Sequence, residues 1–210
     1  MNRRELLKMI AVVTGTAVIG GELFLEGCNT PGSELINGFS EKDIALLDEV
    51  AETILPKTNT PGAKDAAVGV FITVMVNDCY TQQDQQVFRE GMVLLNDACQ
   101  NKFNTDFMKA TKEERHALLL SLDNEAKAYQ KKVAVFNNEQ NEKEQEEFER
   151  GNLAFKKSFM SSHYYTMMKQ LTLLGFFTSE KGATEALRYV PVPGRYDACI
   201  PYHKGDRAWA

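Results

Sequence analysis

The stretch LAFKKSFMSSHYYTMMKQLTLLG, residues Leu153 to Gly175, is the most regularly patterned part of the 210-residue chain. Its apolar side chains recur at steps of seven, four, three, four and three residues, as on one face of an α-helix. A second apolar stripe runs beside the first, and together they form a wide face that must be buried. We therefore predict one long, central helix. The stripes are Leu153, Met160, Tyr164, Met167, Leu171 and Leu174, and Phe148, Phe155 and Phe159.

Shorter helical patterns precede this stretch. Ser40 is suited to cap a helix that Pro56 ends, and Thr111 opens a capping box. Apolar residues at helical spacing also mark residues 68–79 and 81–99. Because the pattern is helical nearly throughout, the sequence predicts an all-α fold. We expect a bundle of about five helices, followed by an extended C-terminal arm rich in proline and aromatic residues.

Residues 137–149 are dense in glutamate, with six Glu and one Lys. Carboxylates bind hard cations, but the Asp/Asn/Gly loop spacing of a calcium site is missing. A solvated helix face or a mobile connection is the better interpretation. The formal net charge of −5 also gives no electrostatic reason to expect nucleic-acid binding.

The N-terminus is typical of an export signal. Arg3 and Arg4 precede an apolar run, residues 9–21, that is too short to span a membrane. NRRELLK resembles a twin-arginine pattern, and LEGC resembles a lipoprotein box in which Cys28 is acylated. We expect export to the periplasmic side and a lipid anchor in a membrane, with an uncleaved anchor helix as the alternative. The predicted parts are a twin-arginine-type lipoprotein signal peptide (1–28), a tether (29–39), a helical domain (40–175) and the C-terminal arm (176–210).

The chain changes character after Gly175. Ser179 is suited to cap a short helix, and three prolines then exclude regular helix. An arm rich in Tyr, Trp and Arg either folds back over its own helices or lies on another protein, because these residues dominate interface anchors. Both alternatives remain open at this point.

The cysteines and the known site motifs give no sign of chemistry in this chain. Cys79 and Cys99 cannot be bridged across a helix about 27 Å long, since a disulfide needs Cα atoms within about 7 Å. Both are predicted to be buried free thiols, and Cys199 on the arm can form an inter-chain disulfide. Metal-ligand spacings, phosphate loops and nucleophile elbows are missing from the sequence. We therefore predict no catalytic, cofactor-binding or metal site.

Two blocks of the sequence match a known family. The C-terminal block is Gly175–Glu180, Ala186-Leu187, Tyr189, Pro193–Tyr196 and Cys199, and the N-terminal block is Leu46–Ile72. Together they resemble the gluconate 2-dehydrogenase subunit 3 family, the small subunit of membrane-associated flavin dehydrogenases for sugars. The resemblance implies an all-α, non-catalytic subunit that binds a large FAD-containing oxidoreductase of the glucose–methanol–choline (GMC) type. It also implies that both proteins cross the membrane together, and that a cytochrome or other electron acceptor is reached through the partner.

The leading hypothesis is therefore an accessory subunit that stabilises, co-exports and anchors a dehydrogenase oxidising gluconate or a related sugar or polyol. One alternative is a stand-alone helical lipoprotein acting as a scaffold or binding module. Another is an enzyme using a polar cluster such as His163, Tyr164 and a glutamate. For partner contact, the hypothesis singles out aromatic and arginine side chains of the arm: Phe176, Phe177, Tyr189, Arg195, Tyr196 and Trp209.

Overall fold

The computed structural model describes residues 38–192, 194–195 and 199–210, all of which fall within a compact unit formed by residues 36–210. These residues form five α-helices, which confirms the predicted all-α class. The helices are α2 (Glu41–Ile54), α3 (Val68–Cys79), α4 (Gln82–Phe103), α5 (Lys112–Glu149) and α6 (Tyr164–Thr178). A short 3-10 turn, η1 (Lys64–Ala66), precedes α3, and a π turn, η2 (Gly182–Ala186), follows α6.

Three of the five described helices, α2, α4 and α5, begin at a residue whose hydroxyl caps the helix. At the start of α5, the Thr111 hydroxyl accepts the Glu114 N–H at 3.3 Å, and the Glu114 carboxylate accepts the Thr111 N–H at 2.8 Å. Ser40 and Thr81 cap α2 and α4 through their own hydroxyls. These local bonds satisfy backbone donors that have no partner inside the helix. Helix starts are therefore set mainly by residues close by in the sequence.

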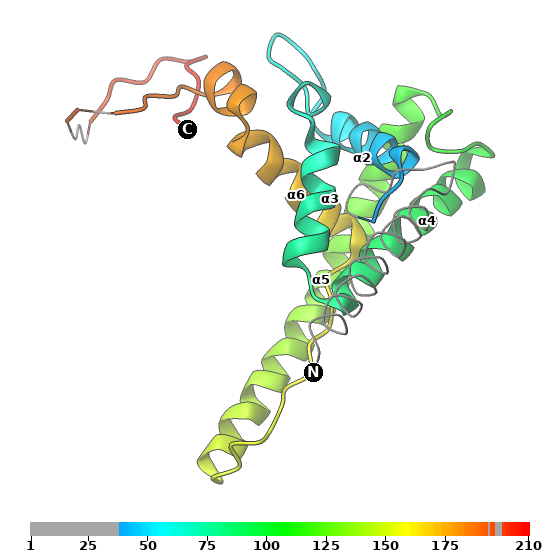
Figure 1. The fold of residues 1–210 in the computed structure, drawn as a ribbon, viewed down its shortest axis with the longest axis vertical. Coiled ribbons are helices and arrows are strands. Elements are labelled where there is room, and N and C mark those ends of the chain that lie inside the picture. Colours follow the sequence, from blue (N-terminus) through cyan, green and yellow to red (C-terminus); the bar gives the residue numbers. More distant parts are fainter. Residues whose placement is uncertain (1–37, 193, 196–198) are drawn as a thin grey trace, which may run out of the picture. The chain divides into compact units, whose positions relative to one another are not determined.

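Helix α6 is the centre of the core. It contacts α2, α3, α4 and α5 (Figure 1), and it buries Met168 and Leu171 among them. Gly91 lets α4 pack closely against the start of α6, because a Cβ at that position would lie 2.2 Å from the Cβ of Tyr164. Each large apolar side chain buried in this way contributes about 1.5–3 kcal/mol. The other core side chains include Leu47, Val50, Val68, Ile72, Val76, Phe88, Leu95, Phe107 and Leu118.

The prediction of one long helix from Leu153 is wrong, because α6 begins only at Tyr164. Helix α5 continues to Glu149, and Gly151 then turns the chain with a left-handed φ of 82°. Leu153 is 79% exposed, and Phe159 is also exposed, so the first half of the pattern has no core to face. The central role of the helix is confirmed for its second half alone.

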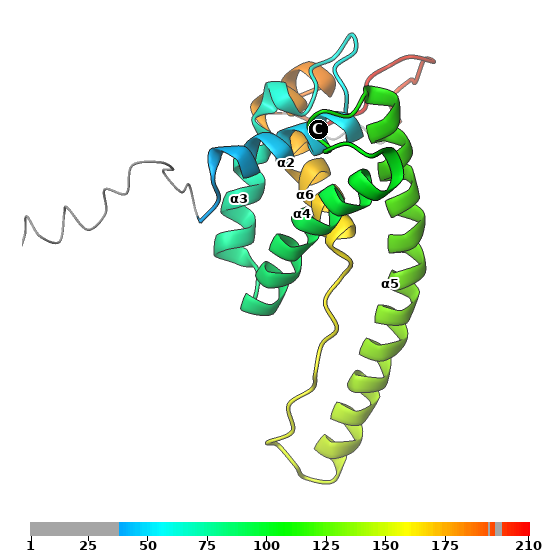
Figure 2. The same cartoon turned by 90° about the vertical axis from the view of Figure 1, so that its right-hand side faces the viewer.

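Residues 152–162 form a return segment that runs back beside the outer part of α5 (Figure 2). Side chains of α5 hold this segment: Asn137 accepts the Met160 N–H and Gln140 accepts the Ser158 N–H, both at 3.3 Å. Lys157 also pairs with Glu144 at 2.7 Å. The glutamate-rich stretch 137–149 is thus helical and largely solvent-facing, which was one of the two predicted alternatives.

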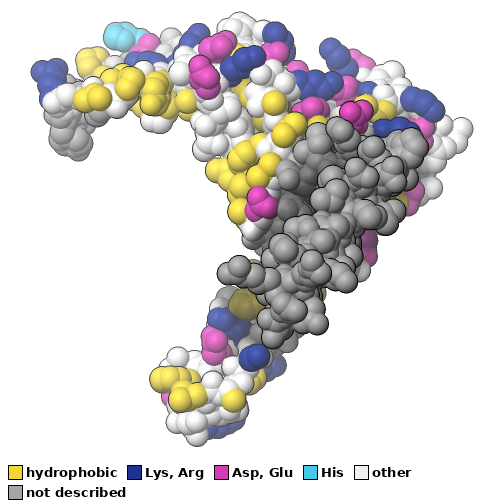
Figure 3. Space-filling model, viewed as in Figure 1, with side chains coloured by type: hydrophobic (Ala, Val, Ile, Leu, Met, Phe, Trp, Pro, Cys, Tyr) yellow, Lys and Arg dark blue, Asp and Glu magenta, His cyan; other side chains and the backbone are white. Residues whose placement is uncertain are grey.

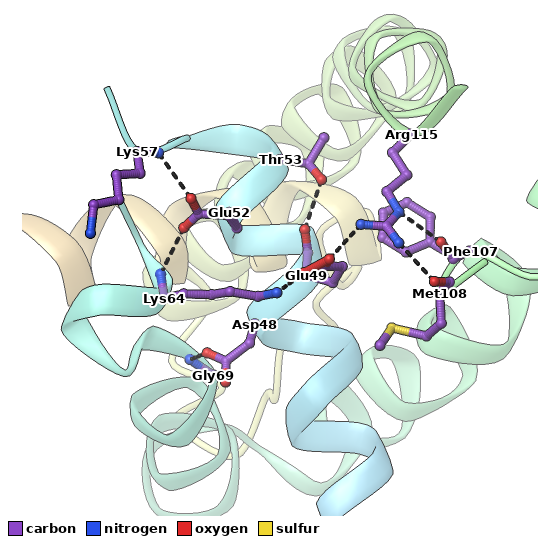
Figure 4. Close-up of polar contacts among 10 residues, drawn as sticks. All are labelled: Asp48, Glu49, Glu52, Thr53, Lys57, Lys64, Gly69, Phe107, Met108 and Arg115. Carbon is purple, nitrogen blue, oxygen red and sulfur yellow. Dashed lines mark hydrogen bonds and ion pairs between the residues drawn. The ribbon is translucent and has the colours of Figure 1, made fainter. Parts of the chain in front are cut away.

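A cluster of charges joins α2 to the start of α5 (Figure 4). The Arg115 guanidinium donates to Glu49 at 2.5 Å and to the carbonyl oxygens of Phe107 and Met108 at 2.8 Å each. Lys64 pairs with the same Glu49 carboxylate. Burial raises the pKa of Glu49, but its bonds to Lys64 and Arg115 outweigh burial and leave that pKa below the usual range. The cluster therefore holds an ionised carboxylate at the helix contact.

Candidate partner-binding surface

The C-terminal arm is tied to itself at the end of η2. The Arg188 N–H donates to the Ala208 carbonyl at 2.8 Å, and the Ala210 N–H donates to the Arg188 carbonyl at 3.0 Å. The Arg188 guanidinium lies 4.6 Å from the centre of the Trp209 ring, an attractive cation–π contact. These contacts draw residues 189–207 into a loop whose two ends lie together.

The described residues of this segment leave their large apolar side chains in solvent. Figure 3 shows apolar side chains along the arm and again over α3 and α6. Contiguous exposed apolar surface on a soluble protein marks an interaction site more often than isolated exposed residues do. The exposed apolar side chains after η2 are Tyr189, Val190, Val192, Ile200, Tyr202 and Trp209.

The structure separates the residues predicted to contact a partner. Phe176 is 4% exposed and belongs to the core, so its assignment as a contact residue is a mistake. Its neighbour Phe177 is 41% exposed and meets it edge to face, with the ring centres 5.2 Å apart. Tyr189 and Trp209 are exposed, as is Arg195.

Other predicted residues lie outside the described part of the chain. They are Tyr196 and the proposed signal and lipidation residues Arg3, Arg4 and Cys28. Tether residues 29–37 and the signal segment also fall there, so those predictions remain as they were.

The three described cysteines carry free thiols, and they differ in exposure. Cys199 is exposed on the arm, so its thiol is accessible to a cysteine of another chain. Cys99 is buried in the core as predicted, and burial raises its pKa. Cys79 is exposed, so the prediction of a buried thiol there is wrong. It lies in the last turn of α3, where the helix projects beyond the buried residues.

An open pocket of 510 Å³ lies between α2 and the start of α5. Its two central charges, Glu49 and Arg115, are paired with each other, and all the hydrogen bonds of that arginine serve the fold. A carboxylate with a lowered pKa is a weak base, so this arrangement does not suit general base catalysis. The lining side chains belong to Glu49, Glu52, Thr53, Pro56, Lys57, Lys112, Glu113, Arg115 and His116.

The alternative that this chain is an enzyme relied on a polar cluster around His163. In the structure, the His163 side chain caps helix α6. The Nδ1 atom accepts the Tyr165 N–H at 3.2 Å, so it carries no proton, and the ring stacks on Tyr164 with the centres 4.4 Å apart. Burial lowers the pKa of His163, while Glu125, 3.9 Å from Nε2, opposes that shift. Burial also raises the pKa of Tyr164 to about 12. Both side chains are therefore neutral near pH 7 and serve the start of α6.

Within the described residues, no group of three or more His, Cys, Asp or Glu is arranged to hold a metal ion. No helix in that part of the chain combines the length and apolar character needed to cross a bilayer. The exposed apolar side chains of the arm make it the strongest candidate for a functional surface in the described part of the chain.

Comparison with protein families gives one match. The family model described as Gluconate 2-dehydrogenase subunit 3 matches residues 41–194, which run from the start of α2 to the first part of the arm. Comparison with curated proteins and with solved structures gives no match. The family match covers most of the chain and confirms the resemblance seen in the sequence.

Proposed function

Because the chain belongs to the gluconate 2-dehydrogenase subunit 3 family, we propose that it is the accessory subunit of a flavin-dependent dehydrogenase complex. Its partner is a large GMC-type subunit that holds FAD and oxidises gluconate or a related sugar or polyol. The chain itself performs no chemistry; it stabilises that partner. A cytochrome or other electron acceptor is reached through the partner.

The observation that carries this proposal is the family match, and the exposed arm supports it. Tyr189 in the loop and Trp209 beside its closing contact present exposed aromatic surface, and Tyr and Trp are favoured anchors at protein interfaces. A flavoprotein surface that covers them would remove this apolar area from water, which favours association. The arm is thus the first contact that we assign to the partner.

We also propose that the chain carries its partner out of the cytoplasm. The paired Arg3 and Arg4 support a twin-arginine route, which accepts folded cargo, and Cys28 supports a lipid anchor. The flavin subunit would then fold around FAD before export. A single acyl chain binds membranes weakly, so stable anchoring requires the multiple acylation typical of lipoproteins.

Co-purification from native expression tests the complex. An affinity tag inserted after Gly151, in the exposed turn that follows α5, leaves both chain ends free. The tagged chain should retain a large subunit with a flavin absorption spectrum. The double variant Tyr189→Ser/Trp209→Ser should lose it, whereas Leu153→Ser, at a still more exposed site away from the arm, should keep it. Recovery of the wild-type chain alone, as a monodisperse monomer, would refute the proposal and favour a stand-alone lipoprotein.

Fractionation tests export and anchoring separately. Arg3→Lys/Arg4→Lys should leave both this chain and the flavin subunit in the cytoplasm, if the partner depends on this signal. Cys28→Ser should shift the complex from the membrane fraction to the soluble fraction. Export of the flavin subunit in the arginine variant would show that the partner has its own signal. A non-reducing gel of the purified complex tests whether Cys199 is bonded to the partner.

A further inference from the structure

A second apolar surface lies on the outer side of α3 and α6. Helix α3 has no charged residue before its last turn, and Lys169 is the sole charged residue of α6. That lysine is already paired with Asp123 at 2.6 Å. Figure 3 shows apolar side chains gathered over these two helices. We call this surface the α3–α6 face; its exposed side chains are Val70, Val74, Leu173, Leu174 and Phe177.

The two helices that form this face pack closely against each other. A Cβ added to Gly175 would lie 2.5 Å from the Phe71 ring, so α6 meets α3 at a distance that a larger residue would not permit. Asp48 of α2 accepts the Gly69 N–H at 2.8 Å and fixes the start of α3. The face is therefore preorganised, which lowers the entropic cost of binding.

Two threonines of these helices keep their hydroxyls away from the face. The hydroxyl of Thr73 donates to the Val70 carbonyl at 2.7 Å, and that of Thr172 donates to the Met168 carbonyl at 2.8 Å. Both threonine side chains are buried. What remains outside is a charge-poor surface with an aromatic residue at one end, the composition that distinguishes the centre of a protein interface from ordinary surface.

We propose that the α3–α6 face is a docking site for the large flavin subunit, through an uncharged apolar patch on that subunit. This inference rests on the proposed function and adds a second site to it. Phe177 belongs to the face, and only Thr178 separates it from Ser179, where the chain leaves α6 toward η2 and the arm. A partner that covers the start of the arm would therefore also contact the face. A lipid surface is the alternative occupant: binding of the wild-type chain alone to anionic vesicles, lost in the face variant described below, would overturn the inference.

Charge placed on the face provides the test. Val74→Glu/Leu174→Glu introduces two carboxylates at partly exposed positions, 37% and 45% exposed. Val93→Glu/Leu94→Glu makes the same two changes on the exposed side of α4 and serves as the matched control. Affinity is measured on purified wild-type and variant complexes by the concentration dependence of dissociation. Circular dichroism and urea unfolding establish that each variant is folded.

We expect the face variant to bind the flavin subunit at least about tenfold more weakly, the loss typical of a disrupted interface centre. The control should bind like the wild type. If the face variant does not fold, Val70→Lys replaces it, because its long side chain can reach water from a 41% exposed position.

Other outcomes separate this inference from the proposed function. If the wild type binds the flavin subunit and the face variant binds it equally well, the docking site is refuted while the accessory role stands. If the wild type is a dimer in sedimentation and the face variant is a monomer, a second copy occupies the face and the inference is wrong. If the wild type retains no flavin subunit at all, both proposals fail.

Discussion

Replacing Arg115 by alanine is expected to lower the free energy of unfolding by about 3–5 kcal/mol, as for removal of one member of a buried ion pair. The arginine side chain is only 12% exposed. Its bonds to Glu49 and to the Phe107 carbonyl are each worth about 1.5–3 kcal/mol, as for hydrogen bonds to charged groups. Water can replace the donor to the Met108 carbonyl, which is exposed. Lys64 still pairs with Glu49 in the variant, which places the expected loss in the lower half of this range.

Arg150→Ala is the matched control, because it removes the same side chain from the end of the same helix. Arg150 is 67% exposed and pairs with Glu146 and Glu147 one turn away, so its loss should cost less than about 1 kcal/mol. Arg115→Lys should fall between the two, because lysine keeps the charge but cannot reach three acceptors at once.

Urea unfolding of the full chain, followed by far-ultraviolet circular dichroism, measures all three variants against the wild type. A common slope for the four curves is required before their midpoints are compared. Equal midpoints for Arg115→Ala and Arg150→Ala would refute the reasoning, since the buried cluster would then contribute no more than a surface pair.

Three further predictions use simple measurements. The difference in stability between the wild type and Arg115→Ala should shrink as the pH falls below about 4. The pKa of Glu49 is lowered by folding, so its ion pair stabilises above the unfolded pKa and is lost on protonation; an unchanged difference in urea titrations near pH 3 would contradict this. Gly91→Ala should destabilise the chain by about 1–3 kcal/mol, despite the better helix propensity of alanine, because its Cβ would clash with Tyr164; a raised melting temperature would exclude that clash. Cys79 should be alkylated in the folded chain and Cys99 only after unfolding, as peptide mass spectrometry can establish; equal rates would show that Cys99 is not sealed in the core.

The helix ends that depend on residues close together in the sequence were predicted best. Ser40 and Thr111 were correctly identified as caps, because each bonds to a backbone group three residues away. The end of α2 before Pro56 was also predicted, because a proline restricts the backbone of the residue directly before it. The family resemblance rested on short blocks of sequence, and the family match confirms it.

Features that depend on the tertiary surroundings were predicted poorly. The spacing of Leu153 and Met160 fits a helix, but Gly151 turns the chain and nothing in the core receives Leu153. Phe176 and Phe177 are adjacent aromatics, and only the position of α6 among its neighbours decides which one is buried. Leu174 was assigned to the core by its period, yet it is exposed because no described helix covers that side of α6.

The place of α6 in the chain has a consequence for biosynthesis. Helices α2 to α5 all leave the ribosome before the helix that they enclose, and the return segment must be completed before α6 is made. The nascent protein therefore holds an unfilled hydrophobic groove until synthesis is nearly over. We expect a chaperone to shield that groove during this interval, and a message cut short before residue 164 to yield a product without a closed interior.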